Sequence, residues 1–257
     1  MMLEVSHLTK KFGGLVAVND LSFSLKEGEI LSIIGPNGAG KSTCFKLISS
    51  FLKPTSGKIE FMGQDITGIG VHNVVAHKIV RTFQETTIFK DMTVRDAVVL
   101  GHQKACRSTI LGMIFRSPAA RRDNEEAEEN ARAVLDLLGM SHVADKKAAG
   151  LPQGMLRNLG IAIALAAKPK LLLLDEPFAG LNTDETRAGV ELVRKIRDAG
   201  ITPILVEHDM SAVMSVSDRI VVVNFGSKIA EGTPDEIKRN DKVIEAYPGS
   251  EDEELGL

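Results

Sequence analysis

The sequence predicts an α/β fold in which a mostly parallel sheet forms the core, with an N-terminal antiparallel β-subdomain and an inserted helical subdomain. Short apolar runs, each long enough for one buried strand, alternate with helix-like segments over most of the chain. The first thirty residues instead alternate apolar and polar positions, as half-buried β-strands do. Residues 92–149 lack a clear strand-like run and contain a strong helical pattern. Strands that alternate with helices indicate a parallel sheet covered on both faces.

The composition is that of a globular protein. With 257 residues, 44% of them hydrophobic, the chain can bury a sizeable core. We expect one domain over residues 1–257, with a helical subdomain inserted at about residues 92–165. The net charge of -3 and the lack of a long basic block argue against a nucleic-acid partner. Cys44 and Cys106 have no metal-binding or redox spacing, so we expect free thiols in a reducing cytosol.

The sequence shows neither a secretory signal nor a membrane span. The first residues, Met1–Val5, lack a basic region followed by an apolar run. No apolar stretch approaches the roughly 20 residues that a helix needs to cross a bilayer. We therefore expect any membrane role to depend on partner subunits.

The first expected strands lead into a glycine-rich loop. Apolar positions alternate over residues 3–8 and 21–25, and a turn at 26–29 leads into the apolar run Ile30–Ile34. A phosphate-binding loop follows this run directly and opens a helix-like stretch. The loop comprises Gly35, Pro36, Asn37, Gly38, Ala39, Gly40, Lys41, Ser42 and Thr43.

This loop has the residue types that hold a nucleoside triphosphate. Its glycines let successive backbone N–H groups curl around phosphate oxygens. Lys41 places a cation on the β- and γ-phosphates, and the Ser42 hydroxyl can ligate Mg²⁺. The helix that follows adds the positive end of its dipole. The strand before the loop and the helix after it are the context that distinguishes a functional loop from a chance match.

Four further apolar runs fit buried strands, at residues 59–61, 171–174, 204–206 and 220–223. The sequence shows no internal repeat and no low-complexity linker. A helix is expected over residues 183–199, ending at Gly200. A capping box at Thr233–Glu236 predicts a last short helix.

The strongest helix of the inserted part begins at Ser117–Pro118. The serine supplies an N-cap and the proline suits the first helical turn. Gly139 ends the helix. One apolar stripe along it predicts the buried face, and it comprises Ala127, Ala131, Val134, Leu135 and Leu138.

Two carboxylates follow the apolar run at residues 171–174. Asp175 and Glu176 stand at the carboxyl end of this expected strand, where open α/β sheets place their ligands. In phosphoryl transfer the first acid would hold Mg²⁺, and a following carboxylate could orient or deprotonate the attacking water. We therefore expect Asp175 to bind the metal and Glu176 to act as the general base.

Two more polar side chains follow apolar runs. His208 comes just after the run at 204–206 and suits a donor to the γ-phosphate or a group that positions water. Gln84 follows residues 80–83 and carries an amide able to touch both Mg²⁺ and water. Taken alone, Gln84 is more simply an exposed loop residue.

In the order of these motifs the chain resembles the ATP-binding cassette (ABC) ATPases over nearly its whole length. The loop at 35–43, Gln84, a helical insertion, residues 151–155, the acid pair, residues 179–182 and His208 match successive motifs of that family. The resemblance implies a P-loop NTPase fold of the ABC ATPase type that binds ATP and Mg²⁺. It also implies that Phe12 stacks on adenine, the alternative being an aromatic packed at a strand end.

Within that family the chain is most similar to the ATPase subunits of branched-chain amino-acid importers. Residues 11–18, 81–84, 175–177 and 206–210 carry this likeness, as does the long insertion around Gly112–Arg122. The resemblance implies a second ABC ATPase subunit, identical or related, two membrane-spanning permease subunits and a soluble solute-binding protein. It also implies a peripheral position on the inner face of the cell membrane and ATP hydrolysis coupled to import. Gln84 would then link γ-phosphate occupancy to the state of the permease.

One motif departs from the family pattern. The signature segment, which in the family reaches the γ-phosphate bound by the partner subunit, comprises Leu151, Pro152, Gln153 and Gly154. Pro152 stands where serine is usual and has neither a hydroxyl nor an N–H. Gln153 and Met155 also depart from the pattern, and Ile163 stands where arginine is common. Losing a donor to a charged phosphate costs about 1.5–3 kcal/mol, partly offset by the helix dipole, so we expect a weak contact across the dimer.

Three other functions remain open. A soluble ABC ATPase of nucleic-acid maintenance or translation would generally carry long coiled-coil insertions or two cassettes, and neither is present. A P-loop kinase would leave Gln84, the signature-like segment and His208 unexplained. A regulatory subunit that binds ATP but hydrolyses it weakly is supported only by Pro152 and its neighbours.

The contrast between an intact loop and an altered signature predicts unequal sites in a mixed dimer. The site built on this chain's loop should hydrolyse ATP well if the partner's signature, which completes it, is intact, and the opposite site should be impaired. We expect Glu176→Gln in this chain to remove most of the turnover of the assembled complex, measured as phosphate release. If the equivalent change in the partner cassette removes it instead, the assignment of the two sites is wrong.

Overall fold

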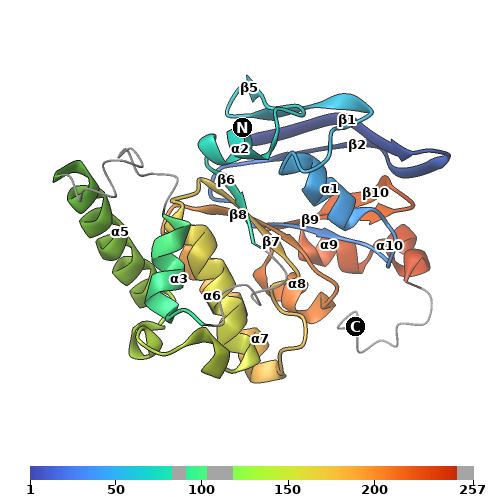
Figure 1. Ribbon diagram of the computed structural model, residues 1–257. Coiled ribbons are helices and arrows are strands. Elements are labelled where there is room, and N and C mark those ends of the chain that lie inside the picture. The colour runs from blue at the N-terminus through green and yellow to red at the C-terminus, as the bar shows by residue number, and fades with distance from the viewer. Residues whose placement is uncertain (83–90, 103–117, 248–257) are drawn as a thin grey trace. The chain divides into compact units, whose positions relative to one another are not determined.

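The computed structural model describes residues 1–82, 91–102 and 118–247 (Figure 1). The chain divides into two compact units, one of residues 1–81 with 170–257 and one of residues 82–169. We call the first the sheet unit and the second the helical unit. Gln84, Cys106 and Ser117 lie outside the described residues.

The sheet unit contains two sheets, and only the larger is mostly parallel. Its strands are parallel except at the β9–β10 edge, and their order is β10 (Ser227–Gly232), β9 (Arg219–Asn224), β3 (Leu31–Ile34), β8 (Thr202–Val206), β7 (Leu171–Asp175) and β6 (Ile79–Arg81). The smaller sheet is antiparallel, in the order β2 (Leu15–Leu25), β1 (Leu3–Phe12), β4 (Ser56–Phe61) and β5 (Gln64–Asp65). The expected combination of a mostly parallel core with an N-terminal antiparallel part is confirmed.

Side chains on opposite faces of strand β3 belong to two different hydrophobic clusters. Leu31 and Ile33 of β3 belong to a cluster shared with the antiparallel sheet, whereas Ile34 belongs to a second cluster. Successive side chains of a strand face opposite sides of the sheet, so a strand covered on both sides must be apolar at nearly every position. This explains the apolar runs of β3, β7 and β8, in which every residue is buried.

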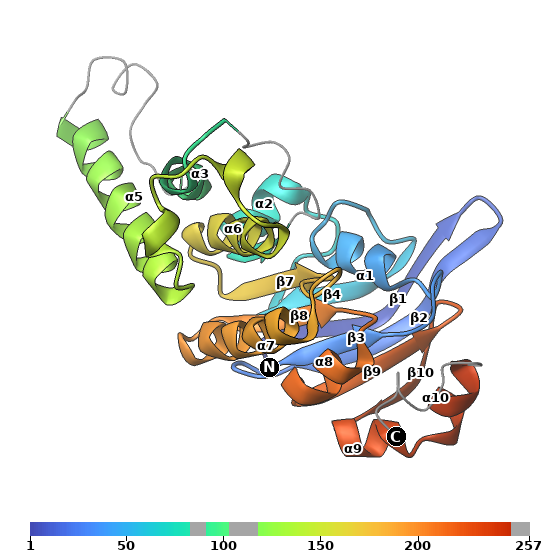
Figure 2. The same cartoon turned by 90° about the horizontal axis from the view of Figure 1, so that it is seen from below.

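Helices cover both sides of the larger sheet. Those of the sheet unit are α1 (Lys41–Ile48), α2 (Val71–Ala76), α7 (Thr183–Asp198), α8 (Met210–Val216), α9 (Pro234–Lys238) and α10 (Asp241–Ala246). Figure 2 shows α1 on one side of this sheet and α8, α9 and α10 on the other. Helix α1 contributes Phe45 to the first cluster, and α9 contributes Ile237 to the second. The helix that opens at the phosphate loop is therefore fixed by the first cluster, which it shares with both sheets.

The starts of two helices follow the sequence signals. Asn182 and Glu185 form a capping box at α7, and Thr233 and Glu236 form the expected one at α9. Helix α9 is not the last helix, because α10 follows it with Asn240 as its N-cap. The prediction failed there because α10 has only six residues, too few to show a helical period.

The helical unit contains three helices within the described residues, α3 (Val94–Gly101), α5 (Pro118–Leu137) and α6 (Gln153–Ala166). Two short 3₁₀ turns lie between α5 and α6, at Ser141–Val143 and Ala148–Gly150. Helix α5 begins at Pro118, as expected, and its apolar stripe is buried. Helices α3 and α6 pack closely, because a Cβ at Gly101 would lie 2.3 Å from the Ile163 carbonyl oxygen.

Three strands of the sheet unit were not expected from the sequence. Strands β5 and β6 have two and three residues, too few for a period to emerge. Strand β10 is an edge strand whose charged positions interrupt its apolar ones. Cys44 is a free, buried thiol in α1, and burial raises its pKa to about 12. None of the helices in the described part of the chain is both long and apolar enough to span a bilayer.

The packing of α1 can be tested at Phe45. Its side chain is fully buried between the two sheets, so Phe45→Ala should lower the free energy of unfolding by about 3–5 kcal/mol through lost burial and a residual cavity. Urea denaturation followed by circular dichroism measures the change. Phe225→Ala is the matched control, because Phe225 is 87% exposed and should give a change within about 0.5 kcal/mol. Equal effects at both positions would contradict the assignment of Phe45 to the core.

Candidate active site

The phosphate loop lies at the carboxyl end of β3, between its last residue Ile34 and the first residue of α1. Strands β8 and β9 flank β3, so the loop leaves from the middle of the larger sheet. Two backbone hydrogen bonds shape the loop, from Ala39 N–H to the Pro36 carbonyl (3.1 Å) and from Gly226 N–H to the Ala39 carbonyl (3.0 Å). The loop is therefore held from outside as well as by its own turn.

Gly40 shows why the loop needs glycine. Its φ of 102° lies in a region that L side chains rarely adopt, and a Cβ there would lie 2.3 Å from the Ala17 carbonyl oxygen of β2. Gly35 meets a similar limit, since its Cβ would lie 2.0 Å from the Val223 carbonyl oxygen of β9. The backbones of β9 and β2 thus leave no room for a side chain at the first and at the last glycine of the loop.

The N-terminus of α1 is built to receive an anion. Gly40 is its N-cap, no side chain accepts a hydrogen bond from the first turn, and no acidic residue lies in that turn. Helices α7 and α9 of the same unit instead begin with capping boxes and have acidic first turns. Uncapped N–H groups and the helix dipole together favour a phosphate at this position.

The side chain of Lys41 folds back onto the carbonyl oxygens of its own loop. Its Nζ donates to the carbonyl oxygens of Gly35 (2.5 Å) and Pro36 (3.1 Å), and the residue is buried. Burial lowers the pKa of this ammonium, and the negative charges of Glu176 and Glu207 raise it in part. The single cation of the loop is therefore surrounded by oxygens and carboxylates within the sheet unit.

Asp175 ends β7 and is buried, with its carboxylate paired to Arg81 of β6 (Nη2 to Oδ2, 2.5 Å). Strand pairing explains the contact, since β6 and β7 run side by side with Arg81 opposite Leu173. We did not predict a role for Arg81 from the sequence. A charged residue directly after the apolar pair Ile79–Val80 was the available signal.

Glu176 follows Asp175 in an uncommon conformation. Its φ is 49°, in the left-handed region where a residue with a side chain is strained. Its N–H donates to the carbonyl of Val206, the last residue of β8 (2.8 Å). Such strain is often found where a side chain must be aimed, which fits the general-base role expected for Glu176.

His208 lies beyond β8, as expected, with its side chain 58% exposed. Its backbone N–H donates to Oε2 of the fully buried Glu207 (2.9 Å), and its Nδ1 lies 3.8 Å from the same oxygen. Glu207 is a second residue to which the sequence analysis assigned no role. A charged residue directly after a buried strand was the signal for it.

The topology brings most of the expected residues of the sheet unit to one edge. Asp175 pairs with Val206, and Val206 pairs with Ile33 two residues before the loop. The loop, the acid pair and His208 therefore all follow the carboxyl ends of the adjacent strands β7, β8 and β3. The Asp175–Arg81 pair lies at the same end of the sheet.

Phe12, the expected adenine platform, ends β1 opposite Leu15. It is 46% exposed, so it is not a core aromatic, and Nζ of Lys10 lies 5.0 Å from its ring centroid. An exposed ring at a strand end suits stacking on a base.

The altered signature segment belongs to the helical unit. Pro152 is the N-cap of α6 and Gln153 is its first residue, and both are exposed. Leu151 is buried and Gly154 lies in the first turn. Proline is compatible with the helix start, where it lies one position before the first turn. No side chain caps this helix.

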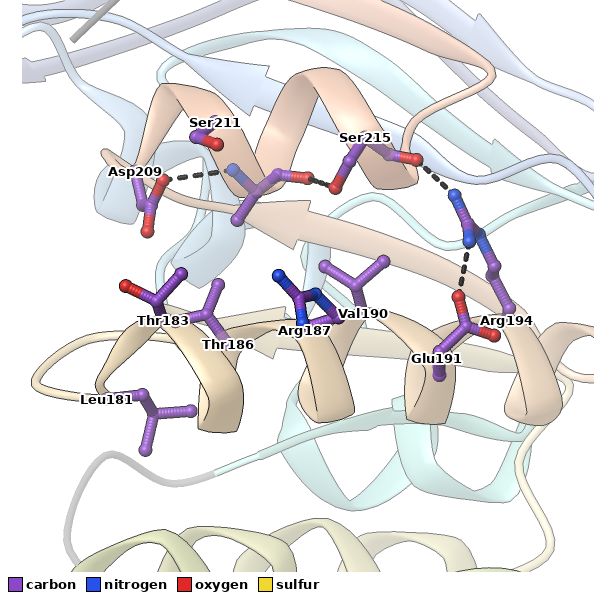
Figure 3. A pocket seen from close by; sticks show the side chains of 11 residues that line it. Leu181, Thr183, Thr186, Arg187, Val190, Glu191, Arg194, Asp209, Ser211 and Ser215 are labelled. Atoms are coloured by element: carbon purple, nitrogen blue, oxygen red, sulfur yellow. Dashed lines mark hydrogen bonds and ion pairs between the residues drawn. The ribbon is translucent and has the colours of Figure 1, made fainter. Parts of the chain in front are cut away.

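A separate pocket of about 400 Å³ lies between α7 and α8 (Figure 3). Arg194 spans it, with one guanidinium nitrogen bonded to Glu191 and another donating to the Ser215 carbonyl oxygen (2.5 Å). Asp209 lines it and caps α8 through the N–H of Ala212. No residue of the phosphate loop lines this pocket, so it is not the phosphate site.

Tyr247, just beyond α10, approaches the loop from the second cluster. Its ring packs against the cluster that includes Ile34, the residue before the loop. Burial raises the pKa of its hydroxyl, which a backbone hydrogen bond with Gly35 lowers in part. The C-terminal helices are thereby connected to the start of the loop.

Two family models match the chain. A model described as "ABC transporter" matches residues 18–179, and one described as "Branched-chain amino acid ATP-binding cassette transporter" matches residues 227–252. Together they cover the phosphate loop, the acid pair and the C-terminal helices.

Curated relatives align over almost their full length. A high-affinity branched-chain amino acid transport ATP-binding protein of Pseudomonas aeruginosa, BraF, is 42% identical over 96% of this chain and 98% of its own. The corresponding protein of Escherichia coli K12, LivG, is 40% identical over the same shares. A probable branched-chain amino acid transport ATP-binding protein of Methanocaldococcus jannaschii is 33% identical over 96% of this chain and 97% of its own.

Solved structures agree with the fold. A nucleotide-free ATP-binding cassette from an ABC transporter matches with a TM-score of 0.85 at 32% identity, covering 97% of this chain and 99% of that one. A structure of the ADP conformation of such a cassette matches with the same TM-score, identity and coverage. The expected ABC ATPase fold is confirmed.

The backbone contact at Gly40 yields a test of the loop. We expect Gly40→Ala to weaken ATP binding at least about 10-fold, because the loop must move away from Ala17 and lose hydrogen bonds to charged phosphate. Isothermal titration calorimetry with Mg-ATP measures the loss. Gly28→Ala is the matched control: its φ is 75°, but a Cβ there would meet nothing within 4 Å. Equal weakening in both variants would show that the carbonyl contact is not the cause.

Proposed function

The chain belongs to the ATP-binding cassette family of transporter ATPases, and on this premise we propose that it powers an importer of branched-chain amino acids or a related small polar solute. The observation that carries the proposal is an intact phosphate loop on an uncapped helix, beside Asp175 and Glu176 at the same sheet edge. Relatives that are 40–42% identical over 96% of the chain are named as branched-chain amino acid transport ATP-binding proteins.

The residues of the loop and of the strand ends would have separate roles in ATP binding and hydrolysis. The N–H groups at the start of α1 would hold the phosphates, and Lys41 would leave the loop carbonyls to meet the β- and γ-phosphates. Glu176 would orient or deprotonate the attacking water, and His208 would donate to the γ-phosphate. Phe12 would stack on adenine with its exposed ring. Gln84, outside the described residues, would sense the γ-phosphate.

The oxygen ligands fit Mg²⁺. Ser42 at the start of α1 and Asp175 at the end of β7 supply a hydroxyl and a carboxylate, and Mg²⁺ usually takes few protein ligands together with substrate phosphates. Across residues 1–82, 91–102 and 118–247, no three His, Cys, Asp or Glu side chains gather into a metal site. When bound, Mg²⁺ would neutralise charge on the phosphates.

The proposed assembly contains two cassettes and two membrane-spanning permease subunits, fed by a solute-binding protein. The second cassette is either a copy of this chain or a related one. Closure of two cassettes around ATP, followed by hydrolysis and reopening, would drive the permease. The chain itself would lie peripherally on the inner face of the cell membrane.

The signature segment supports unequal sites. Pro152 and Gln153 are exposed at the start of α6, where they would meet the partner's nucleotide with one N–H fewer than a serine provides. A regulatory, weakly hydrolysing subunit is the second candidate function, and this segment is the observation that favours it. ATP hydrolysis by the whole complex distinguishes the two candidates.

Reconstitution tests the proposal. We expect the chain to co-purify with two permease subunits and, in proteoliposomes with a binding protein, to support Mg-ATP-dependent leucine uptake. Lys41→Ala should abolish nucleotide binding and uptake, because it removes the cation of the loop. Lys46→Ala in the last turn of α1 is the matched control and should change neither, since Lys46 is exposed. Binding without hydrolysis in the wild-type complex would favour the regulatory function, and no binding at all would refute both.

A further inference from the structure

We propose that Glu207 is a positioning residue for ATP hydrolysis, whose buried carboxylate holds the segment after Glu176 and the segment of His208 in one fixed arrangement. The inference rests on the proposed function, since it assigns how two residues of that site are held. Glu207 would act through these two residues and not by touching the nucleotide.

The contacts of Glu207 join two loops. Its Oε1 accepts the N–H of Phe178, two residues after Glu176, at 2.6 Å. Its Oε2 accepts the N–H groups of His208 at 2.9 Å and of Asp209 at 3.4 Å. One carboxylate thus spans from the loop after β7 to the loop after β8, and the partners are backbone groups on both sides.

On the first side, the segment 176–178 is tied at both ends. The N–H of Glu176 donates to Val206, and the N–H of Phe178 donates to the next residue, Glu207. The Phe178 ring is buried and lies against Gly189 of α7, where a Cβ would meet it at 3.0 Å. A strained φ persists only where the surroundings enforce it, and these three contacts enforce the conformation of Glu176.

On the second side, the same carboxylate sets the turn that presents His208. It binds the backbone N–H groups of His208 and Asp209, directly before α8, which begins at Met210. Nδ1 of the His208 ring lies 3.8 Å from Oε2, so the carboxylate is on the Nδ1 side of the ring. The opposite ring nitrogen, Nε2, would then be the one that meets a phosphate oxygen.

The chemistry of the position argues for a role beyond packing. Glu207 is fully buried, and a carboxylate is costly to bury unless its oxygens are satisfied. Burial raises the pKa of the carboxyl, against the lowering effect of the three N–H donors and of His208. An apolar residue directly after strand β8 would be buried at lower cost, but it would leave three N–H groups without this acceptor.

The test uses the full chain in its assembled complex, with variants Glu207→Gln and Glu207→Asp. The amide replaces one acceptor oxygen with a donor, and the aspartate withdraws the carboxylate by one methylene. We expect each to lower kcat about 10- to 100-fold, because a shift of about 1 Å in a catalytic group has this effect, with KM for ATP changed less than about 3-fold. Asp is the variant that remains informative if Gln does not assemble.

Two controls separate positioning from a general effect of the substitution. Glu29→Gln removes another largely buried carboxylate, which binds Arg219 and the Lys26 N–H, and it should leave kcat unchanged. Combining Glu207→Gln with His208→Ala should cost less than the product of the two single losses, since both act on one arrangement. A structural defect would instead lower ATP binding and thermal stability together with kcat.

The proposal is overturned if either folded Glu207 variant keeps kcat within about 2-fold of wild type, or if the losses in the double variant multiply. These outcomes leave the proposed function intact, provided that the wild-type complex hydrolyses ATP and Glu176→Gln does not. Failure of the wild-type complex to hydrolyse ATP would instead remove the premise.

Discussion

Two backbone carbonyls from neighbouring strands limit the space at the ends of the phosphate loop, and the rest of the site depends on that constraint. The Ala17 oxygen of β2 and the Val223 oxygen of β9 leave no room for a Cβ at Gly40 and Gly35. The antiparallel sheet and strand β9 of the larger sheet therefore set the loop's conformation together. Helix α1 can present uncapped N–H groups because its start is fixed by these contacts and its body by the core around Phe45.

The charges of the site are arranged so that each has a partner within the sheet unit. Lys41 meets loop carbonyls and feels Glu176 and Glu207, while Asp175 is paired with Arg81. When a triphosphate and its cation bind, Lys41 would exchange the loop carbonyls for phosphate oxygens, and Asp175 would exchange Arg81 for the cation. Little uncompensated charge therefore needs to be buried in either state. Pre-positioned groups of this kind stabilise a charged transition state without reorganising during the reaction.

The sequence predicted the parts of this arrangement that are local. Continuous apolar runs located β3, β7 and β8, and the glycine-rich segment located the loop between β3 and α1, because each signal lies within one short segment. Arg81 and Glu207 were assigned no role, because their partners lie 94 and 29 residues away and only strand pairing brings them together. The short strands β5 and β6 and helix α10 were missed because they lack the length that a periodic pattern needs.

The packing of Tyr247 has an optical consequence. The chain contains one tyrosine and no tryptophan, so its intrinsic ultraviolet fluorescence above the phenylalanine background comes from this single ring. That ring packs against the cluster that contains Ile34, the residue before the loop. The unmodified protein therefore carries its own spectroscopic reporter, and its emission reflects the surroundings of the residue before the phosphate loop without any introduced label.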